Sequence, residues 1–541
     1  MGDSLEGATR IGLHSPPEFL GFLRPFADLF YRSEGRWAMN RYLVGLMAPI
    51  PRKNCEQIAA AVAGIKAQEL QALLTDIPWD YSQMDHLRVD LLLKQATVGD
   101  GILVFDDTGI PKQGRDSVGV ARQYSGTLGK VGNCQISVTC RYVDPCYTWP
   151  VVGRLYLPKA WANDEGRRAK AKVPKEVKFQ TKAEIALAQL DQAKGWGIHH
   201  EAVTADSNYG DNPNFLAGLE ARDELYIVAI PRDFTVRLPD ELAKARQEAD
   251  QADPMGSGAI IGSVSEGVPA PDIAAGNQIS TAEGASKPKR RGRPPKVPRV
   301  LSPEERTPLH KACELTPTQP ESAWQAITYR EGAKGPITKE FLALRACRAL
   351  KGNADGEGAY TGSEGWLIGE RPLTGHEGEP KWYYSNFPAE AALSRMAEIC
   401  HRREPIERGY RVGKDGLGLD EAEVRLWHGF HRHQALVMLA ETWLVLQRQW
   451  LEPVAVPLPE PDSALVMPTP QTAIPPGEIA PSTPVSTPAR STSRPMPSPP
   501  YGADRRNPTS RASADERMVL HQLRPLAGRH QADRSPTCSA A

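Results

Sequence analysis

The sequence predicts an α/β protein: a mixed-sheet core interrupted by a β-rich insertion, with an N-terminal helical domain and a disordered C-terminal tail. Three observations support this prediction. Apolar residues near the N-terminus recur at three- and four-residue steps. Between residues 99 and 233, short apolar runs alternate with helical segments. The last 90 residues hold 18 of the 48 prolines, which predicts a segment that buries too little apolar surface to fold.

Composition sets the bounds for this organisation. The 541 residues are enough for two to four domains, and the 40% hydrophobic content can supply a sizeable core. Lys and Arg number 65, as do Asp and Glu, so the chain as a whole carries no nucleic-acid signature. The eight cysteines form no C-x-x-C pair, which argues against a structural zinc site and against a secreted disulfide framework. Cys134 and Cys140 are predicted to be reduced thiols in the core.

The sequence gives no sign of membrane insertion or export. The first 15 residues lack the charged and apolar regions of a signal peptide. The most apolar late stretch, residues 435–446, is too short to span a bilayer and contains Glu441. We therefore expect a cytoplasmic protein without a membrane partner.

Residues 1–98 form the predicted helical domain. Phe19, Phe22, Phe26 and Phe30 recur at helical steps, as expected for one buried helix face. Basic residues on its surface favour a DNA-binding role for this domain.

Residues 99–233 form the first part of the predicted core. The expected order is strand, strand, strand, helix, strand, helix, strand, at residues 102–105, 135–142, 151–157, 182–194, 202–206, 213–219 and 225–230. Three adjoining strands followed by alternating helix and strand build a mixed sheet with helices on its faces. This order is that of a ribonuclease-H-like fold, in which the first and fourth strands are expected to lie side by side.

Two of these predicted strands end in acids. Residues 102–105 are apolar and lead into Asp106 and Asp107, after which a turn is expected at Thr108 and Gly109. Asp206 closes the run at residues 202–205. Carboxylates at the ends of buried strands face the crevice where α/β proteins bind ligands, and three converging carboxylates can hold Mg²⁺. The alternative is structural, because aspartate also begins turns and caps helices.

The rest of the chain divides into four segments. Residues 234–307 predict a flexible linker, and residues 308–387 predict a β-rich insertion with strands around 324–330, 341–347, 366–368 and 382–384. Residues 388–451 predict closing helices, the last of which is apolar on more than one face. Residues 452–541 are the Pro- and Ser-rich tail.

Basic tracts favour contact with DNA. The tract RRGRPPK lies in the linker and is similar to an AT-hook, a motif that lies in the minor groove of A·T-rich DNA; its basic residues are Arg290, Arg291, Arg293 and Lys296. A soluble basic linker is an equally weighted interpretation. A second basic run spans residues 167–178 and is predicted to follow phosphates, with a solvated loop as the alternative.

Two further groups of side chains are candidates for a functional site. Lys112, together with Arg122, Gln123 and Tyr124, follows the first acids closely and could touch DNA. His428, His431 and His433 lack the spacing of a zinc motif, and their aromatic neighbours favour helix packing.

Three long stretches resemble the DDE-type transposases of bacterial insertion sequences, in the group with a Tyr-Arg-Glu-Lys signature around the third acid. They are FDDTGIPKQGRDSVGVARQYSGTLGKVGNCQISV, TADSNYGDNPNFL and REPIERGYRVGKDGLGLDEAEVRLWHGFHRHQALVMLA. The resemblance covers roughly residues 38–450 and leaves out the tail. It implies a ribonuclease-H-like core with a β-rich insertion before the last acid, acting with divalent metal on transposon ends.

Carried over by position, the resemblance implies that Asp107, Asp206 and Glu407 are the catalytic and metal-binding acids, with Asp106 the alternative to Asp107. Arg403 and Lys414 match the signature and would bind DNA phosphates. The chain departs from the signature where Cys400 stands in the Tyr position, and again at Pro405 and Gly409. Because proline lacks an N–H, the helix that carries Glu407 is expected to kink or to begin at Pro405.

The resemblance also implies cofactors and partners. Two Mg²⁺ ions about 3.5–4 Å apart, with Mn²⁺ a substitute, would support strand cleavage and strand transfer. The partners would be double-stranded DNA, as terminal inverted repeats and as target, and further copies of the chain in a homo-oligomer at the nucleoid. Two alternatives stay open: a catalytically inactive or domesticated DNA-binding protein or repressor, and a ribonuclease-H-like nuclease that takes no part in transposition.

Overall fold

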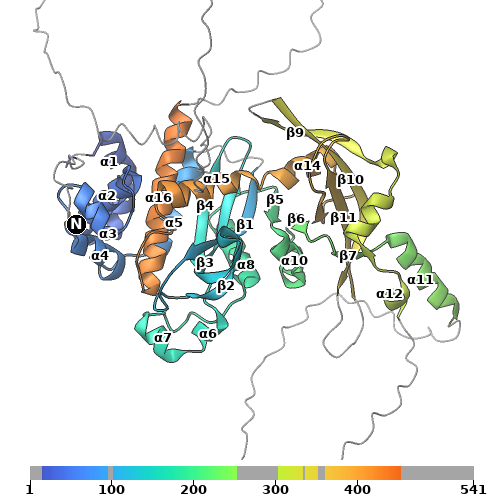
Figure 1. Cartoon of the computed structure of the whole chain (residues 1–541), viewed down its shortest axis with the longest axis horizontal. Coiled ribbons are helices and arrows are strands. Elements are labelled where there is room, and N and C mark those ends of the chain that lie inside the picture. The colour runs from blue at the N-terminus through green and yellow to red at the C-terminus, as the bar shows by residue number, and fades with distance from the viewer. Residues whose placement is uncertain are drawn as a thin grey trace, which may run out of the picture.

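The structure is a computed structural model that describes residues 12, 15–95, 101–252, 302–332, 335–350 and 360–451. The AT-hook-like tract, with Arg290, Arg291, Arg293 and Lys296, lies outside the described residues, and so does the tail at 452–541. Figure 1 shows two sheets side by side, with an N-terminal group of helices at the far end of the first. The predicted mixed α/β class is confirmed.

The N-terminal region is helical, as its apolar spacing predicts. Its helices are α1 (Pro17–Leu23), η1 (Arg24–Leu29), α2 (Ser33–Met47), α3 (Cys55–Ala61), α4 (Ala67–Thr75) and α5 (Tyr81–Gln95). Phe19, Phe22, Phe26 and Phe30 are buried. The rings of Phe19 and Phe22 lie 5.2 and 5.1 Å from that of Trp443, so this helical group is packed onto the last helix of the chain.

The first sheet has the strand order β2-β3-β1-β5, with β4 paired to β3. Its strands are β1 (Ile102–Pro111), β2 (Ala121–Ser125), β3 (Lys130–Val143), β4 (Thr148–Leu155) and β5 (Ala202–Ala205). β1 runs antiparallel to β3 and parallel to β5, from Ile102 beside Ala202 to Phe105 beside Ala205. The two acid-bearing strands therefore lie side by side, as predicted.

One local prediction is wrong. No turn forms at Thr108 and Gly109, because β1 continues to Pro111. The reason is that β3 has 14 residues and keeps pairing: Thr108 lies opposite Ser137, and Gly109 opposite Ile136. The acids Asp106 and Asp107 thus lie within a strand, at the point where the shorter β5 has ended.

Five helices accompany the first sheet: three lie between β4 and β5 in the sequence, and two follow β5. They are α6 (Lys159–Ala162), α7 (Glu165–Lys170), α8 (Lys182–Gly195), α9 (Ser207–Gly210) and α10 (Pro213–Glu220). α8 begins with a capping box formed by Thr181 and Glu184. β2, α6 and α7 were not predicted, because short polar segments carry little periodicity.

The second sheet has the order β6-β12-β11-β10-β7-β8, with β9 paired to β10. Its strands are β6 (Ile227–Ile230), β7 (Thr235–Arg237), β8 (His310–Lys311), β9 (Gln325–Gly332), β10 (Gly335–Leu350), β11 (Tyr360–Arg371) and β12 (Lys381–Ser385). Three helices and two short 3-10 turns accompany it: α11 (Pro239–Ala252), α12 (Pro303–Arg306), α13 (Ala312–Leu315), η3 (Thr316–Thr318) and η4 (Glu321–Ala323). β6 was expected in the first sheet. It pairs with β12 instead, and a single bridge between Val203 and Tyr226 joins it to β5.

The closing helices are α14 (Leu393–His401), α15 (Pro405–Arg411), the π-helical turn η5 (Val412–Gly416) and α16 (Trp427–Leu451). α15 begins at Pro405, as one of the two expected geometries requires. Most of α16 is buried, and its Glu441 forms an ion pair with Arg141 of β3 in the interior. Within the described ranges, no helix has the length and apolarity needed to cross a membrane.

Candidate active site

The site lies where β5 ends beside β1. Parallel pairing stops at Phe105 and Ala205, so the next residues of β1 lose their neighbour on that side. Successive side chains of a strand point to opposite faces. Asp106 and Asp107 therefore face different sides of the sheet, and each meets its own partners.

Asp107 faces α8 and α9. Lys182 Nζ, at the start of α8, donates to Asp107 Oδ2 at 2.6 Å, and the Tyr209 hydroxyl of α9 donates to Asp107 Oδ1 at 2.8 Å. Burial raises the pKa of Asp107, while the positive charge of Lys182 acts in the opposite direction. Asp107 is thus a desolvated carboxylate with a single cation beside it.

Asp106 faces α15. Its Oδ2 accepts a hydrogen bond from Arg403 Nη2 at 2.6 Å, and its Oδ1 accepts from the backbone N–H of Asp107 at 2.7 Å. Burial raises the pKa of Asp106 to about 6, with Arg403 opposing the shift and the negative charge of Asp206 adding to it. Both aspartates therefore feel Asp206, which also raises the pKa of Asp107.

Asp206 follows β5 and caps the one-turn helix α9. Its Oδ1 accepts the backbone N–H groups of Asn208 at 3.0 Å and Tyr209 at 3.3 Å. The structural interpretation of this residue is therefore correct, but it does not exclude a functional one. The capped turn also directs the Tyr209 hydroxyl to Asp107, so the second acid helps to position the first.

The third acid lies apart from these contacts. Glu407, on α15, is exposed, and its side chain makes no hydrogen bond or ion pair with any residue that the structure describes. Its neighbours on α15 and η5 hold the helix over the sheet. The Tyr410 hydroxyl bonds Thr139, whose hydroxyl donates to the Asp106 carbonyl at 3.1 Å, and Lys414 Nζ donates to the Gly109 carbonyl at 3.1 Å.

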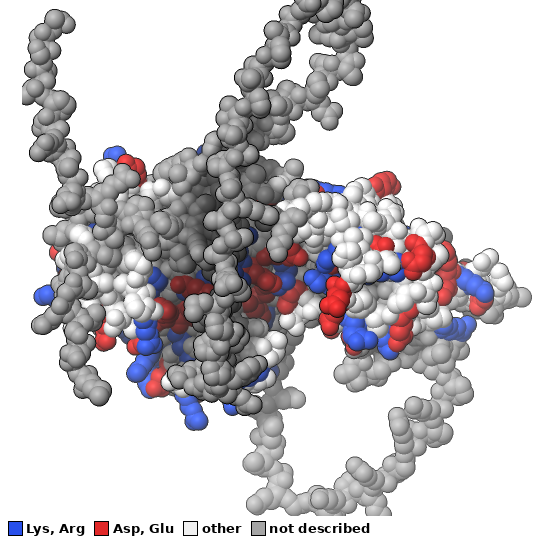
Figure 2. Space-filling model, turned by 45° about the horizontal axis from the view of Figure 1, so that its top comes forward, with Lys and Arg blue, Asp and Glu red and all other residues white. Residues whose placement is uncertain are grey.

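The carboxylates do not converge in this arrangement. Across the described ranges, no three His, Cys, Asp or Glu side chains are close enough to hold a metal ion together. The structure brings Asp106, Asp107 and Asp206 into one electrostatic group and places Glu407 on the flank of the helix above it. In Figure 2, acidic side chains gather with basic ones near the middle of the view, between the two halves.

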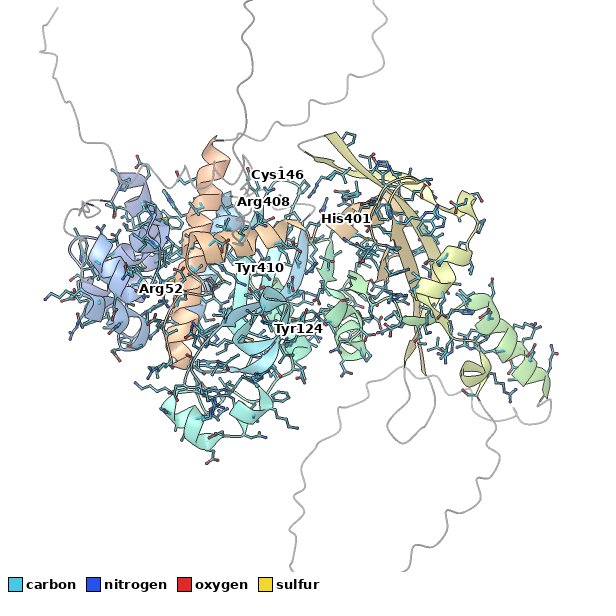
Figure 3. The ribbon with its side chains drawn as sticks, in the orientation of Figure 1. Arg52, Tyr124, Cys146, His401, Arg408 and Tyr410 are labelled. Carbon is cyan, nitrogen blue, oxygen red and sulfur yellow. The ribbon has the colours of Figure 1, made fainter. Side chains whose placement is uncertain are left out.

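His401, the last residue of α14, connects the second sheet to the site (Figure 3). The His401 ring stacks on Tyr329 at 3.7 Å, and its nitrogens lie 3.0 Å from Glu370 of β11 and 2.8 Å from Glu404. Burial opposes protonation, but the two carboxylates outweigh it and raise the pKa of His401. This cluster fixes the residues before α15, and with them Arg403. A cavity of about 200 Å³ between it and Asp206 is lined by both.

Comparison with known proteins adds the decisive observation. Residues 25–288 match the sequence model of the DDE superfamily endonucleases. Just under half of the chain is therefore similar to the DDE superfamily of endonucleases. The matched range includes Asp106, Asp107 and Asp206 but ends before Glu407. Two of the three acids that the resemblance implied thus lie within the matched part of the chain.

A curated relative points in the same direction. The chain is 32% identical over 200 residues to a protein of Microchaete diplosiphon described as a probable transposase for insertion sequence element IS701. The aligned part is 37% of this chain and 50% of the relative. The chain therefore spans about half the length of the curated relative that it matches.

The sequence did not single out Lys182 or Tyr209, the two partners of Asp107. Lysine in the first turn of a helix is electrostatically unfavourable, so its presence there is a weak sign of a tertiary partner. Tyr209 lies three residues after Asp206, in the stretch that carried the resemblance. Neither signal identifies Asp107 as the partner, because the residues are about 75 and 102 positions away from it.

Lys112, which was expected to contact DNA, is half-buried in the structure and has a backbone partner. Its Nζ donates to the Ala422 carbonyl at 2.8 Å, and burial lowers its pKa. The basic run at 167–178 begins in α7, where Arg167 stacks on Trp161 at 3.7 Å and donates to the Arg115 carbonyl at 3.0 Å. Cys134 and Cys140 are free and buried, as predicted.

Gly409 explains one departure from the signature. A Cβ atom at this position would lie 2.4 Å from Arg141 Nη2. α15 can therefore lie this close to the sheet only because residue 409 has no side chain. The lack of a side chain at Gly409 therefore determines how close α15, and with it Glu407, lies to the sheet.

Gly409→Ala should lower the free energy of unfolding by about 1–3 kcal/mol, because Arg141 or α15 must move. Gly416→Ala is the matched control, since its Cβ would meet only Val412 at 3.9 Å. Urea unfolding measures both variants. Equal stability of the two variants would contradict this account of Gly409.

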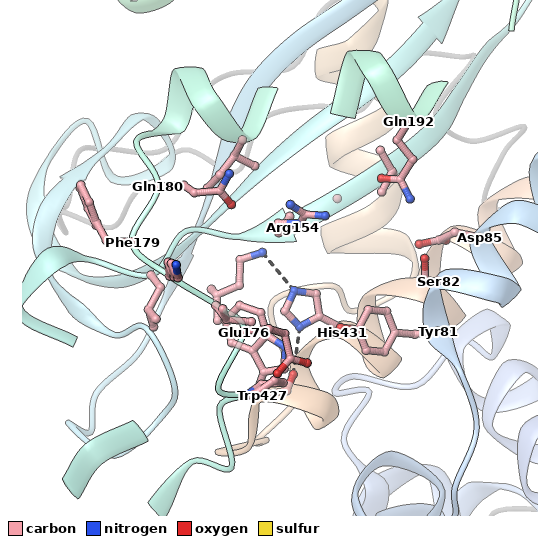
Figure 4. A pocket seen from close by; sticks show the side chains of 18 residues that line it. Tyr81, Ser82, Asp85, Arg154, Glu176, Phe179, Gln180, Gln192, Trp427 and His431 are labelled. Atoms are coloured by element: carbon pink, nitrogen blue, oxygen red, sulfur yellow. Dashed lines mark hydrogen bonds between the residues drawn. The ribbon is translucent and has the colours of Figure 1, made fainter. Parts of the chain in front are cut away.

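Two of the three α16 histidines, His431 and His433, are buried among other side chains, as helix packing predicts, whereas His428 is half-buried. His431 Nδ1 lies 3.0 Å from the Trp427 carbonyl, and its Nε2 accepts the Leu155 N–H at 3.3 Å, which fixes a neutral ring (Figure 4). Burial lowers the pKa of His431 to about 3. The ring borders a cavity of about 610 Å³ between α5, β4 and the segment before α8.

A depressed histidine pKa predicts a specific dependence of stability on pH. Because the folded state holds His431 neutral, its contribution is present above the unfolded pKa of about 6.5 and is lost as pH falls towards about 3. At pH 5 the loss should be roughly 2 kcal/mol. His431→Gln should make the fall in unfolding free energy between pH 7.5 and 5 smaller by this amount, as urea titrations at each pH would measure. An unchanged pH profile in the variant would show that His431 titrates normally.

Proposed function

We propose that this protein is a DDE transposase, which cleaves DNA strands at the ends of an insertion sequence and transfers them to target DNA. The observation that carries the proposal is that Asp106 and Asp107 of β1 lie beside Asp206, which directly follows the parallel strand β5, within the range that matches the family model. The catalytic set is Asp107, Asp206 and Glu407. The description of the relative as a probable transposase supports the same substrate class.

The donor set fits a divalent cation in its chemistry. Carboxylate oxygens are the hard ligands that Mg²⁺ prefers, and Mn²⁺ takes similar sites. Asp106 and Asp107 each already hold a cationic side chain, and the charge of Asp206 acts on both of them, as in a site built to attract positive charge. Asp107, Asp206 and Glu407 would hold the ions. Such ions stabilise the attacking and leaving oxygens of a phosphodiester.

The protein side chains would hold and orient the DNA. Arg403 and Lys414 lie on the same side of the sheet as Asp106, Arg403 on its carboxylate and Lys414 on the Gly109 carbonyl. Both are cations close to the acids and suit the phosphates that flank the cleaved bond. The basic tract at residues 290–296 would add minor-groove contacts away from the site.

The architecture supports a ribonuclease-H-like core with an insertion. The antiparallel strands β4, β3 and β1 are followed by β5, which pairs in parallel with β1, and a single bridge joins β5 to the start of β6. The segment between β6 and α14 forms most of the second sheet and returns the chain to the acids. We propose that this unit works as a homo-oligomer on paired DNA ends in the nucleoid.

A cleavage assay tests this function. The substrate is a duplex that contains the inverted repeats bracketing the reading frame, and the readout is Mg²⁺-dependent nicking with a free 3′-hydroxyl. Joining of that 3′-hydroxyl to a second duplex distinguishes a transposase from another nuclease of this superfamily. Binding without any nicking in Mg²⁺ or Mn²⁺ would show that the chain is not an active transposase.

A second function has a specific observation in its favour. Each aspartate of the pair is neutralised by a basic side chain, and Glu407 contacts neither. A catalytically inactive, DNA-binding descendant or repressor would show these features in every state. The same assay decides, because such a protein binds the ends in a metal-independent manner and leaves them uncut.

Lys182→Gln should tighten binding of Mn²⁺, because the lysine ammonium and the ion compete for the Asp107 carboxylate. We expect roughly a threefold to tenfold lower Kd, since a partly exposed ion pair contributes up to about 1 kcal/mol. Electron paramagnetic resonance of free Mn²⁺ measures this without DNA. Lys194→Gln is the control, because its ion pair is with Glu224. Equal Mn²⁺ affinity in the two variants would mean that Lys182 does not compete with the ion for Asp107.

A further inference from the structure

The hairpin formed by β2 and β3 exposes two apolar side chains at its end. Tyr124 is 59% exposed and Val131 is 53% exposed. They are direct partners across the hairpin, so they form one patch. Large hydrophobic side chains that stay this exposed and adjoin each other are a sign of an interaction surface.

The strand register explains the exposure. Pairing of β1 with β3 ends at Pro111 and Cys134, so residues 130–133 extend past the sheet with β2 as their partner. Arg122 and Tyr124 share a face of β2, and alternation along β3 places Val131 on the same face as Thr139, which lies opposite Asp106. The hairpin thus projects from the strand that lies beside the acids.

The charge at the hairpin end is positive. Arg122 and Lys130 are exposed, and residues 121–133 contain no acidic side chain, although the chain as a whole is neutral. The α6–α7 segment is attached to the same corner. Trp161 Nε1 donates to the Val120 carbonyl at 2.7 Å, and Arg167 donates to the Arg115 carbonyl. Figure 1 shows α6 and α7 next to β2, and Figure 3 places Tyr124 at this end of the sheet.

We propose that this hairpin end docks on the DNA duplex beside the cleaved position, with Tyr124 and Val131 in the minor groove and Arg122 and Lys130 on phosphates. The inference rests on the proposed function. Minor-groove proteins combine apolar wedges with basic side chains in this way. The absence of any acid at the hairpin end favours DNA over a second copy of this neutral chain.

The register also predicts where the contact falls. Eight residues of β3 separate Thr139 from Val131, a span of roughly 26 Å along the strand. At about 3.4 Å per base pair, this corresponds to roughly eight base pairs of duplex. The hairpin end should therefore protect DNA about eight base pairs from the cleaved bond.

The test compares two variants of the full chain. Tyr124→Ala combined with Val131→Ser removes the patch, and Tyr31→Ala removes a tyrosine that is 94% exposed elsewhere. We expect the double variant to bind a 30-base-pair end duplex roughly tenfold more weakly and to lose protection about eight base pairs from the cleavage site. Tyr31→Ala should bind like the unaltered protein. Thermal unfolding confirms that both variants fold.

A second comparison distinguishes the contribution of the basic side chains to DNA binding from that of the apolar patch. Arg122→Gln with Lys130→Gln should lower the slope of log affinity against log salt by about two, because two phosphate contacts are lost. Cleavage of a duplex that ends about four base pairs from the cut should stay unchanged in all these variants. If the unaltered protein does not cleave this short duplex, the result counts against the proposed function. If the variant Tyr124→Ala with Val131→Ser binds DNA and protects it as the unaltered protein does, this inference alone is overturned. A double variant that changes only self-association would assign the surface to a second copy and overturn it too.

Discussion

Asp107→Asn should abolish strand cleavage while binding to end DNA persists. The asparagine keeps the shape of the side chain but removes the negative charge that a divalent ion requires, and Tyr209 and Lys182 lose a charged acceptor. We expect the cleavage rate to fall by three orders of magnitude or more, on the order of 4 kcal/mol of transition-state stabilisation. Single-turnover nicking in Mg²⁺ measures the rate, and a gel-shift titration measures binding.

Asp106→Asn is the matched control, because the two aspartates are neighbours on one strand that face opposite sides. Asp106 holds Arg403, so its variant should bind end DNA differently while keeping measurable cleavage. The reverse pattern, with cleavage lost in Asp106→Asn and kept in Asp107→Asn, would transfer the metal-binding role to Asp106. That outcome would also fit the geometry, since Asp106 faces α15, which carries Glu407.

Removing one member of the buried pair between Arg141 and Glu441 should have the largest effect on stability. The side chains are 5% and 7% exposed, so Glu441→Leu would leave an uncompensated guanidinium in the interior. We expect a loss of about 3–5 kcal/mol in the free energy of unfolding. Because Arg141 supports α15 at Gly409 and lies 5.8 Å from the Tyr410 ring, cleavage should fall as well.

The double variant Arg141→Met with Glu441→Leu distinguishes a charge effect from a packing effect. Apolar side chains of similar volume should recover much of the lost stability, because no buried charge is then left alone. Urea unfolding of the two single variants and the double variant completes the cycle. Additive losses in the double variant would mean that the pair acts through packing.

Strong local signals predicted the main elements of this fold. The apolar runs at 102–105 and 202–205 gave two strands, and their adjacency followed from the alternation of helix and strand between them. The phenylalanine spacing gave the N-terminal helices, and Pro405 gave the start of α15. In each case a short-range pattern or the chemistry of one residue decides the structure.

The predictions that failed concern residues whose structure depends on partners far away in the sequence. β1 extends through Thr108 and Gly109 because β3 offers partners there, although glycine usually favours a turn. The β2 hairpin carries no clear alternation, and β6 joins β12 across some 150 residues of chain. Lys182 is the corresponding case in the site, since nothing near it in sequence indicates a carboxylate partner. The metal-binding role of Asp107, Asp206 and Glu407 stays a prediction.

Anomalous diffraction from Mn²⁺ in a crystal of the protein bound to end DNA tests the central claim most directly. The account predicts Mn²⁺ peaks at about 2.0–2.2 Å from oxygens of Asp107 and Asp206, with a Glu407 oxygen at the same distance from one of the ions. Binding of DNA must then have moved Lys182 away from Asp107 and brought Glu407 inwards. Mn²⁺ bound elsewhere, or Glu407 still exposed in a complex whose DNA ends are in place, would contradict the account.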